Sequence, residues 1–182
     1  QRTREEENTL CEVWAEVAEY AGRSGITIGI EPINRYESYM CTSAEEVLRF
    51  IKCVDAPNLS LHLDTFHMNI EEDNMVEAIL LAGDKLGHFH VGENNRRLPG
   101  KGGFPWYEIG MALRAIGYQG NVVMEPFVRN GGTVGNDIKI WRDLSQGASL
   151  AQLDSDARNS VAFLRNVFSG PTSDYHSILH KN

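Results

Sequence analysis

The sequence predicts an α/β protein built on a parallel sheet, because helical and extended patterns alternate along it. A helical pattern comes first and is followed by four short apolar runs, each leading into another helical segment. The runs are apolar almost throughout, as in residues 26–30, which is typical of strands covered on both faces. Two architectures fit this order, a doubly wound open sheet and part of a (β/α)8 barrel. No GxGxxG follows any run, which removes the strongest indication of a dinucleotide-binding open sheet.

The first helix is expected over residues 4–21, where apolar residues recur at three- and four-residue spacing before Gly22 and Gly25 end it. Thr42-x-x-Glu45 has the pattern of a capping box and opens a second helix that reaches about Val54. Strands are predicted over residues 26–30, 59–63, 87–91 and 121–124, and the remaining helices over 74–81, 107–116 and 154–168. The tail, residues 169–182, is polar and expected to be loose.

Composition narrows the class of protein. The 182 residues, 42% hydrophobic and 23% charged, suit one globular domain. The formal charge is −8, so the chain has no excess of basic residues, and this argues against nucleic acid as a partner. No apolar run approaches the ~18 residues of a membrane span, and no signal peptide is visible. Cys11, Cys41 and Cys53 have no CxxC spacing, so we expect reduced thiols in a cytoplasmic protein.

Each predicted strand ends beside a side chain that can bind a metal ion. These are Glu31, Asp64, His90 and Glu125, in chain order. Alone, each carboxylate could equally be a helix cap or a surface charge, and the histidine a packed side chain. The carboxyl ends of neighbouring parallel strands converge on one face, however, so we expect the four to meet. Three carboxylates and one imidazole suit Mn²⁺, Mg²⁺ or Co²⁺ better than a structural zinc.

Further polar residues follow the same strand ends. Glu37 lies in the loop after the first strand. His67 follows Asp64 by three residues, and Arg96 follows His90 by six. The loops that carry these residues are expected to form the rim of the site. His62 and His88 are expected to point away from the site and to be structural.

A segment rich in glycine and proline, residues 99–106, lies between the third strand and its helix. It could cradle a phosphate. Lys101 is its only charge, which favours a loop that shapes the substrate pocket.

Five motifs together resemble one known family. They are Glu31-Pro-x-Asn-Arg-Tyr-Glu37, Asp64-Thr-Phe-His-Met-Asn69, His90-x-Gly-Glu-Asn-x-Arg96, Pro99-Gly-Lys-Gly102 and Met124-Glu-Pro-Phe127. In this order and spacing they resemble the D-tagatose 3-epimerase / D-allulose (D-psicose) 3-epimerase family, which belongs to the xylose isomerase-like barrels. The resemblance extends to about Phe168 and is strongest to the D-allulose epimerases.

The resemblance implies a (β/α)8 TIM barrel that holds Mn²⁺ or Co²⁺ on Glu31, Asp64, His90 and Glu125. It implies that Glu37, His67 and Arg96 bind the O1–O2 end of a ketose, and that the enzyme is a dimer or tetramer. A complete barrel usually needs about 250 residues. Residues 1–168 are therefore expected to be only the C-terminal part of one barrel domain, strands five to eight with the preceding helix, followed by the tail, residues 169–182.

The expected reaction is epimerisation at C3, between D-fructose and D-allulose or between D-tagatose and D-sorbose. A metal ion on the C2 carbonyl and C3 hydroxyl would stabilise the enediolate. Glu31 and Glu125 would exchange roles as base and acid on the two faces of C3.

Three alternatives to the C3 epimerase remain open. A related aldose–ketose isomerase would move the proton between C1 and C2. A phosphodiesterase acting on abasic DNA would need further histidine ligands and a basic groove, against which the charge of −8 counts. The third alternative is a half-barrel fragment that binds metal or a partner chain without catalysis.

Overall fold

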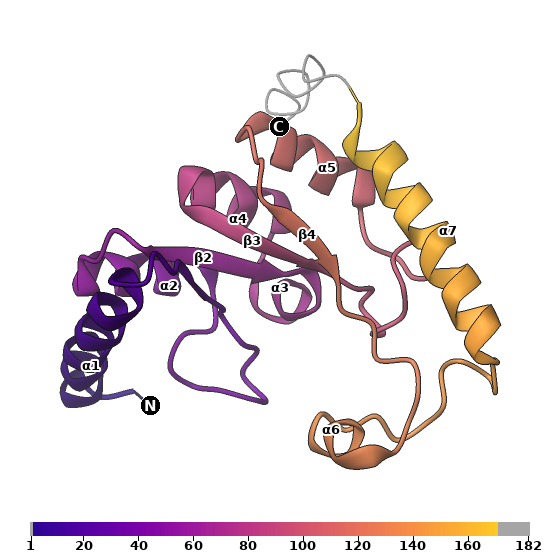
Figure 1. Ribbon diagram of the computed structural model, residues 1–182, viewed down its shortest axis with the longest axis horizontal. Coiled ribbons are helices and arrows are strands. Elements are labelled where there is room, and N and C mark those ends of the chain that lie inside the picture. The colour runs from indigo at the N-terminus through magenta and orange to yellow at the C-terminus, as the bar shows by residue number, and fades with distance from the viewer. Residues whose placement is uncertain (1, 171–182) are drawn as a thin grey trace.

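The structure, a computed structural model, describes residues 2–170 and contains one four-stranded parallel sheet. Its strands are β1 (Ile28–Ile30), β2 (Leu59–Asp64), β3 (Leu86–Val91) and β4 (Asn121–Met124), and they neighbour one another in chain order (Figure 1). The predicted parallel α/β architecture is confirmed. Within the described part of the chain, β1 and β4 each have one free edge.

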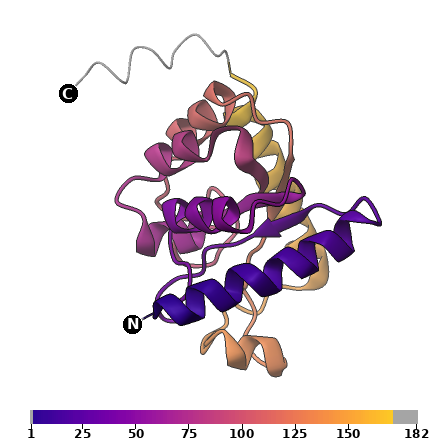
Figure 2. The same ribbon diagram turned by 90° about the vertical axis from the view of Figure 1, so that its left-hand side faces the viewer.

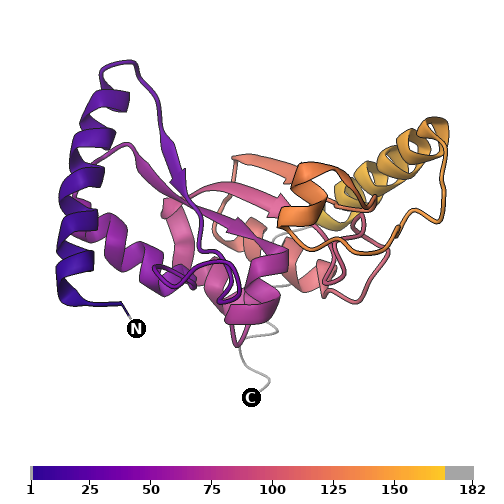
Figure 3. The ribbon, with the colours of Figure 1, turned by 90° about the horizontal axis from the view of Figure 1, so that it is seen from below.

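Five helices form a row along one face of the sheet. They are α1 (Arg4–Gly22), α2 (Ala44–Val54), α4 (Met75–Ala82), α5 (Trp106–Ala115) and α7 (Leu150–Phe168). Consecutive helices of the row contact one another, and α1 and α7 lie at opposite ends of the arc seen in Figure 3. No helix among residues 2–170 is long and apolar enough to cross a membrane.

Three short helices complete the structure: α3 (Thr65–Glu71), the 3-10 turn η1 (Gly83–Lys85) and α6 (Gly132–Asp137). The sequence patterns predicted none of them. Helix α3 begins at the residue after β2, and Asp64 serves both as the last residue of the strand and as the helix N-cap. A helix this short has too few turns for a periodic apolar face to show in the sequence.

The strands alternate between a buried face and a more open one. On β2, Leu61 and Leu63 are fully buried beneath the helices, whereas Ser60 and His62 are half-buried. The expectation of strands covered on both faces is therefore wrong for the described chain. Period-two alternation places polar side chains on the face that no helix covers.

The capping box predicted at Thr42 and Glu45 does not form, and the N-cap lies one residue further along. Ser43 is the N-cap of α2 and accepts a hydrogen bond from the Glu46 backbone N–H. The Glu46 carboxylate accepts from the backbone N–H of Thr42 instead of closing the box on Ser43. A complete capping box does occur at α1, between Thr3 and Glu6.

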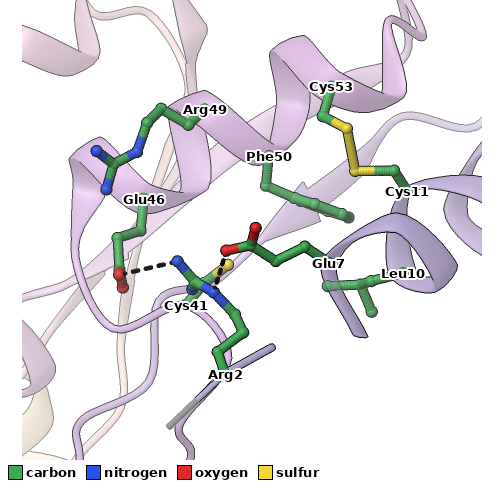
Figure 4. A pocket seen from close by; sticks show the side chains of 9 residues that line it. All are labelled: Arg2, Glu7, Leu10, Cys11, Cys41, Glu46, Arg49, Phe50 and Cys53. Atoms are coloured by element: carbon green, nitrogen blue, oxygen red, sulfur yellow. Dashed lines mark hydrogen bonds and ion pairs between the residues drawn. A yellow bond between two sulfur atoms is a disulfide. The ribbon is translucent and has the colours of Figure 1, made fainter. Parts of the chain in front are cut away.

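A disulfide joins α1 to α2, which run side by side in Figure 2. Cys11 and Cys53 form the bond, 42 residues apart in sequence, so the expectation of reduced thiols is wrong for this pair and holds for Cys41. Figure 4 shows the bond at one side of a pocket that Arg2 also lines, where the Arg2 guanidinium bridges Glu7 and Glu46. The spacing of the cysteines does not indicate this pairing, because only helix packing brings the two sulfurs together.

Candidate functional site

The four predicted metal ligands lie at the carboxyl ends of the strands. Glu31 follows β1, Asp64 ends β2, His90 is the penultimate residue of β3, and Glu125 follows β4. Asp64 and His90 are direct partners in the parallel register. The parallel sheet thus brings residues far apart in sequence to one rim.

The candidate ligand atoms fall into two overlapping groups, within each of which all atoms lie within 4.8 Å of one another. Glu31, Asp64 and His67 form one group, and Asp64, His90 and Glu125 form the other. Asp64 is fully buried and common to both. His67, which the motif resemblance assigned to substrate binding, therefore also lies within reach of a shared ion.

Burial and mutual repulsion raise the pKa values of two of these carboxyl groups. The pKa of Glu31 rises to about 7, first because the group is buried and then because Asp64 and Glu125 are close. Burial, with Asp64 next, also raises the pKa of Glu125. Such crowding of acids marks a place that a cation would stabilise.

The donor set fits a divalent ion. Glu31 Oε1 and His90 Nδ1 are buried atoms with no hydrogen-bond partner among the described residues. Unpartnered buried acceptors are costly unless something else satisfies them. Three carboxylates and an imidazole are oxygen-rich ligands of the kind that Mn²⁺, Mg²⁺ and Co²⁺ accept.

Arg96 supplies a positive charge to the same group. Its Nη1 donates to Asp64 Oδ2 at 3.1 Å and to Glu125 Oε2 at 3.3 Å. The guanidinium carbon lies 3.7 Å from the centroid of the Phe66 ring and 5.0 Å from that of Phe127. Stacking on two aromatic rings fixes the plane of the guanidinium and thus the direction of its donors.

Glu37 and His67 are linked through Asn34, a fully buried residue that the sequence did not single out as functional. The Asn34 side-chain amide donates to Glu37 Oε1 at 2.7 Å, and its backbone N–H donates to His67 Nδ1 at 3.2 Å. Since Nδ1 accepts this hydrogen bond, the ring proton of neutral His67 lies on Nε2. Asn34 thereby sets the orientation of two predicted substrate-binding residues.

The expectation that His62 and His88 point away from the site is wrong. Residues two apart on a strand share a face, so His62 lies on the face of Asp64 and His88 on that of His90. The ring centroids of His62 and His90 are 4.2 Å apart. Burial, followed by the neighbouring imidazoles, lowers the pKa of His62 to about 4.

The glycine-rich loop is organised by Glu93, a buried carboxylate that the sequence did not indicate. Glu93 accepts hydrogen bonds from the backbone N–H groups of Gly100 and Phe104 and from the indole N–H of Trp106. A Cβ at Gly102 would overlap the Glu93 carboxylate, so the loop requires glycine there. Two loop amides are thus already satisfied, which argues against a phosphate cradle and for a shaped loop beside the site.

A family model described as the xylose isomerase-like TIM barrel matches residues 1–166. The chain therefore belongs to this family, which accounts for the parallel sheet, the row of helices and the polar strand ends.

Within the family, the predicted resemblance to D-allulose (D-psicose) 3-epimerases is confirmed. A D-psicose 3-epimerase of Agrobacterium fabrum is 56% identical over 154 residues, which cover 85% of this chain and 53% of that protein. A crystal structure of a D-psicose 3-epimerase in the presence of D-fructose matches with a TM-score of 0.86 and 54% identity, over 88% of this chain and 55% of that one. A D-psicose 3-epimerase with D-tagatose from Clostridium cellulolyticum H10 matches with a TM-score of 0.85 and 52% identity, over 87% of this chain and 55% of that one. The chain spans about half the length of the curated relatives it matches.

Proposed function

We propose that this chain is the carboxyl-terminal part of a metal-dependent ketose 3-epimerase. Residues 1–168 would supply strands five to eight of a (β/α)8 barrel, and residues 169–182 a tail. The identity of 50–56% to D-psicose 3-epimerases supports this reading. The observation that carries it is the placement of Glu31 and Glu125 after β1 and β4, the two outermost strands of the sheet.

Inversion at C3 requires one group to remove a proton from one face of the carbon and another to return it on the opposite face. Glu31 and Glu125 come from opposite edges of the sheet, with Asp64 and His90 on the strands between them. A ketose lying across the rim would therefore present its two C3 faces to different carboxylates. Each Glu would act as base in one direction and as acid in the other, which suits a reversible reaction.

Glu31, Asp64, His90 and Glu125 are the proposed ligands of Mn²⁺, with Co²⁺ or Mg²⁺ as alternatives. When bound, the ion would stabilise the negative charge that develops on the ketose oxygens as C3 loses its proton. Its charge would also lower the raised pKa values of Glu31 and Glu125. Both carboxylates would then be ionised and able to accept a proton at neutral pH.

Glu37, His67 and Arg96 are the proposed ligands of the O1–O2 end of the sugar. With its proton on Nε2, His67 has a donor for a sugar oxygen, while Glu37 can accept from a hydroxyl. Arg96 would add a fixed positive charge at the same end. The substrates proposed are the small ketoses D-fructose and D-allulose, or D-tagatose and D-sorbose, and the proposed assembly is a homodimer or homotetramer.

Glu31→Gln and Glu125→Gln test the two-base scheme in a longer protein that contains this chain. Each should lower Mn²⁺-dependent conversion of D-fructose to D-allulose by at least about 1,000-fold, because no second group can complete the proton transfer. Glu108→Gln, an exposed change on α5, is the control. Mn²⁺ binding is measured alongside, so that loss of the ion is separated from loss of the base. Activity within a few-fold of the unmutated enzyme would refute the scheme.

Product analysis separates C3 epimerisation from aldose–ketose isomerisation. In D₂O, a C3 epimerase incorporates deuterium at C3 of the ketose, whereas an isomerase exchanges the proton between C1 and C2 and yields an aldose. Formation of glucose or mannose from D-fructose would replace the proposal with the isomerase alternative.

A further inference from the structure

Three histidines form a cluster on the open face of the sheet, and two of them, His62 and His88, lie two residues before the strand-end ligands Asp64 and His90. His62 and His88 are direct register partners on β2 and β3, and His90 follows on the same face of β3. The three ring centroids lie 4.2–4.9 Å apart in edge-to-face arrangements. The cluster uses two residues that the proposed epimerase chemistry does not.

The nitrogen atoms of the cluster converge. One ring nitrogen from each of His62, His88 and His90 lies within 4.8 Å of the other two. Three ring nitrogens at this spacing need only small side-chain rotations to reach one ion, since the Zn–N bonds of such sites are about 2.0–2.1 Å long.

The cluster is also incompletely satisfied. His62 Nε2 and His90 Nδ1 are buried and have no hydrogen-bond partner among residues 2–170. The closest carboxylate contacts are 3.8 Å from His62 Nδ1 to Glu31 and 3.6 Å from His90 Nδ1 to Glu125, too long for hydrogen bonds. A histidine that serves only for packing usually has its ring nitrogens bonded, so the free acceptors point to a ligand.

We propose that His62, His88 and His90 form a second divalent-metal site, selective for ions that prefer imidazole, such as Zn²⁺ and Ni²⁺. Three nitrogen ligands with open positions suit these ions, whereas the strand-end group, rich in carboxylate, suits harder ions. His90 belongs to both groups, so an ion held by the histidines competes for a ligand of the carboxylate site.

Zinc binding to Asp64→Asn tests the site, because this change removes the carboxylate shared by both strand-end groups. Calorimetry with ZnCl₂ alone on the full chain should show that Asp64→Asn still binds Zn²⁺. The double variant Asp64→Asn/His88→Ala should bind Zn²⁺ with an affinity at least about 100-fold lower. This loss exceeds the 10–100-fold loss that is typical when an outer-shell partner, rather than a metal ligand, is removed. Co²⁺ absorption of Asp64→Asn should show nitrogen coordination that the double variant lacks. His176→Ala, in the tail outside the described residues, is the matched control.

Two outcomes would overturn the proposal. One is equal Zn²⁺ affinity in Asp64→Asn and in the double variant. If Asp64→Asn does not fold, the single variant His88→Ala must weaken Zn²⁺ binding while Mn²⁺ affinity persists, and unchanged Zn²⁺ affinity is the second overturning outcome. These measurements use no sugar, so a negative result for the histidine site does not contradict the epimerase proposal. A negative result in the epimerase assay likewise does not contradict the histidine site.

Discussion

At the scale of single residues, Glu31 makes the stability of the metal-free chain depend on pH. Its pKa lies near 4.5 in the unfolded chain and at about 7 in the folded one, so the folded state binds an extra proton between these values. The contribution of Glu31 to the free energy of unfolding should therefore fall as pH rises from 5 to 8, by about 2 kcal/mol once partial exposure is allowed for. The lowered pKa of His62 contributes in the opposite sense below about pH 6.5. Urea unfolding in EDTA at the two pH values, compared between the unmutated chain and Glu31→Gln, isolates the Glu31 contribution.

Glu31→Gln should remove that contribution, because the amide does not titrate. Glu16→Gln, at an exposed position of α1, should leave the fall unchanged. Identical pH dependence in the unmutated chain and in Glu31→Gln would show that the raised pKa does not destabilise the fold.

The hydrogen bonds of Glu93 predict a loss of stability when this residue is replaced. Glu93→Ala leaves three donors of the loop without their acceptor, on Gly100, Phe104 and Trp106. The free energy of unfolding should fall by about 3 kcal/mol or more, since bonds to a buried charge contribute about 1.5–3 kcal/mol. Thermal unfolding measures the change, with the exposed Glu12→Ala as control. A loss below about 1 kcal/mol would show that the loop keeps its shape without the carboxylate.

At the scale of elements, the disulfide ties the first helix to the second. Replacing Cys11 with Ser should lower the free energy of unfolding by about 2–4 kcal/mol, because the bond closes a loop of 42 residues that the unfolded chain would otherwise leave free. Reducing agent should have the same effect on the unmutated chain and none on the variant. Thiol titration of the denatured, unreduced chain should find one free cysteine, Cys41. Three reactive thiols would contradict the bond.

The elements predicted from sequence are those with a long pattern. Apolar runs and three- to four-residue periodicity placed the strands and the five longer helices within a few residues. Helix α3 was missed because it begins directly at Asp64 and is seven residues long. The N-cap of α2 is Ser43 rather than Thr42, because these two residues are adjacent candidates in sequence and only the contacts of Glu46 distinguish them.

The strand-end groups were predictable because parallel strands impose a common rim on residues that the chain separates. Asn34 and Glu93 were not, since their roles depend on contacts with His67 and the glycine-rich loop that no local pattern encodes. The positions of His62 and His88 follow from the sequence, because two-residue periodicity by itself places them on the same face as the strand-end ligands. The disulfide depended on helix packing and left no signal in the spacing.

At the scale of the whole molecule, the free edges of β1 and β4 predict self-association. Beside β4 lies an open apolar groove of about 760 Å³, lined by Val122, Leu164 and Phe168 among others. An unpaired edge next to apolar surface is a template for pairing with another chain. Sedimentation velocity should show dimers or larger species, and a well-behaved monomer of 20.4 kDa would contradict this prediction.

A charge placed at the β4 edge should weaken that association. Val123→Lys adds a lysine to the exposed edge strand, whereas Val13→Lys on α1, also exposed, is the control. Only the first substitution should shift the chain toward monomer. Equal effects of both would indicate general solubilisation rather than pairing through the sheet edge.

The position of Asp64 has a consequence for how events at the rim spread through the protein. One of its carboxylate oxygens accepts from the Phe66 backbone N–H at the start of α3, and the other accepts from Arg96. A ligand that draws electron density from the Asp64 carboxylate weakens its hydrogen bonds to Phe66 and Arg96. A ligand that fixes the orientation of this carboxylate stabilises the first turn of α3, the helix that carries His67. Occupancy at the rim and the local opening of α3 are thus thermodynamically linked.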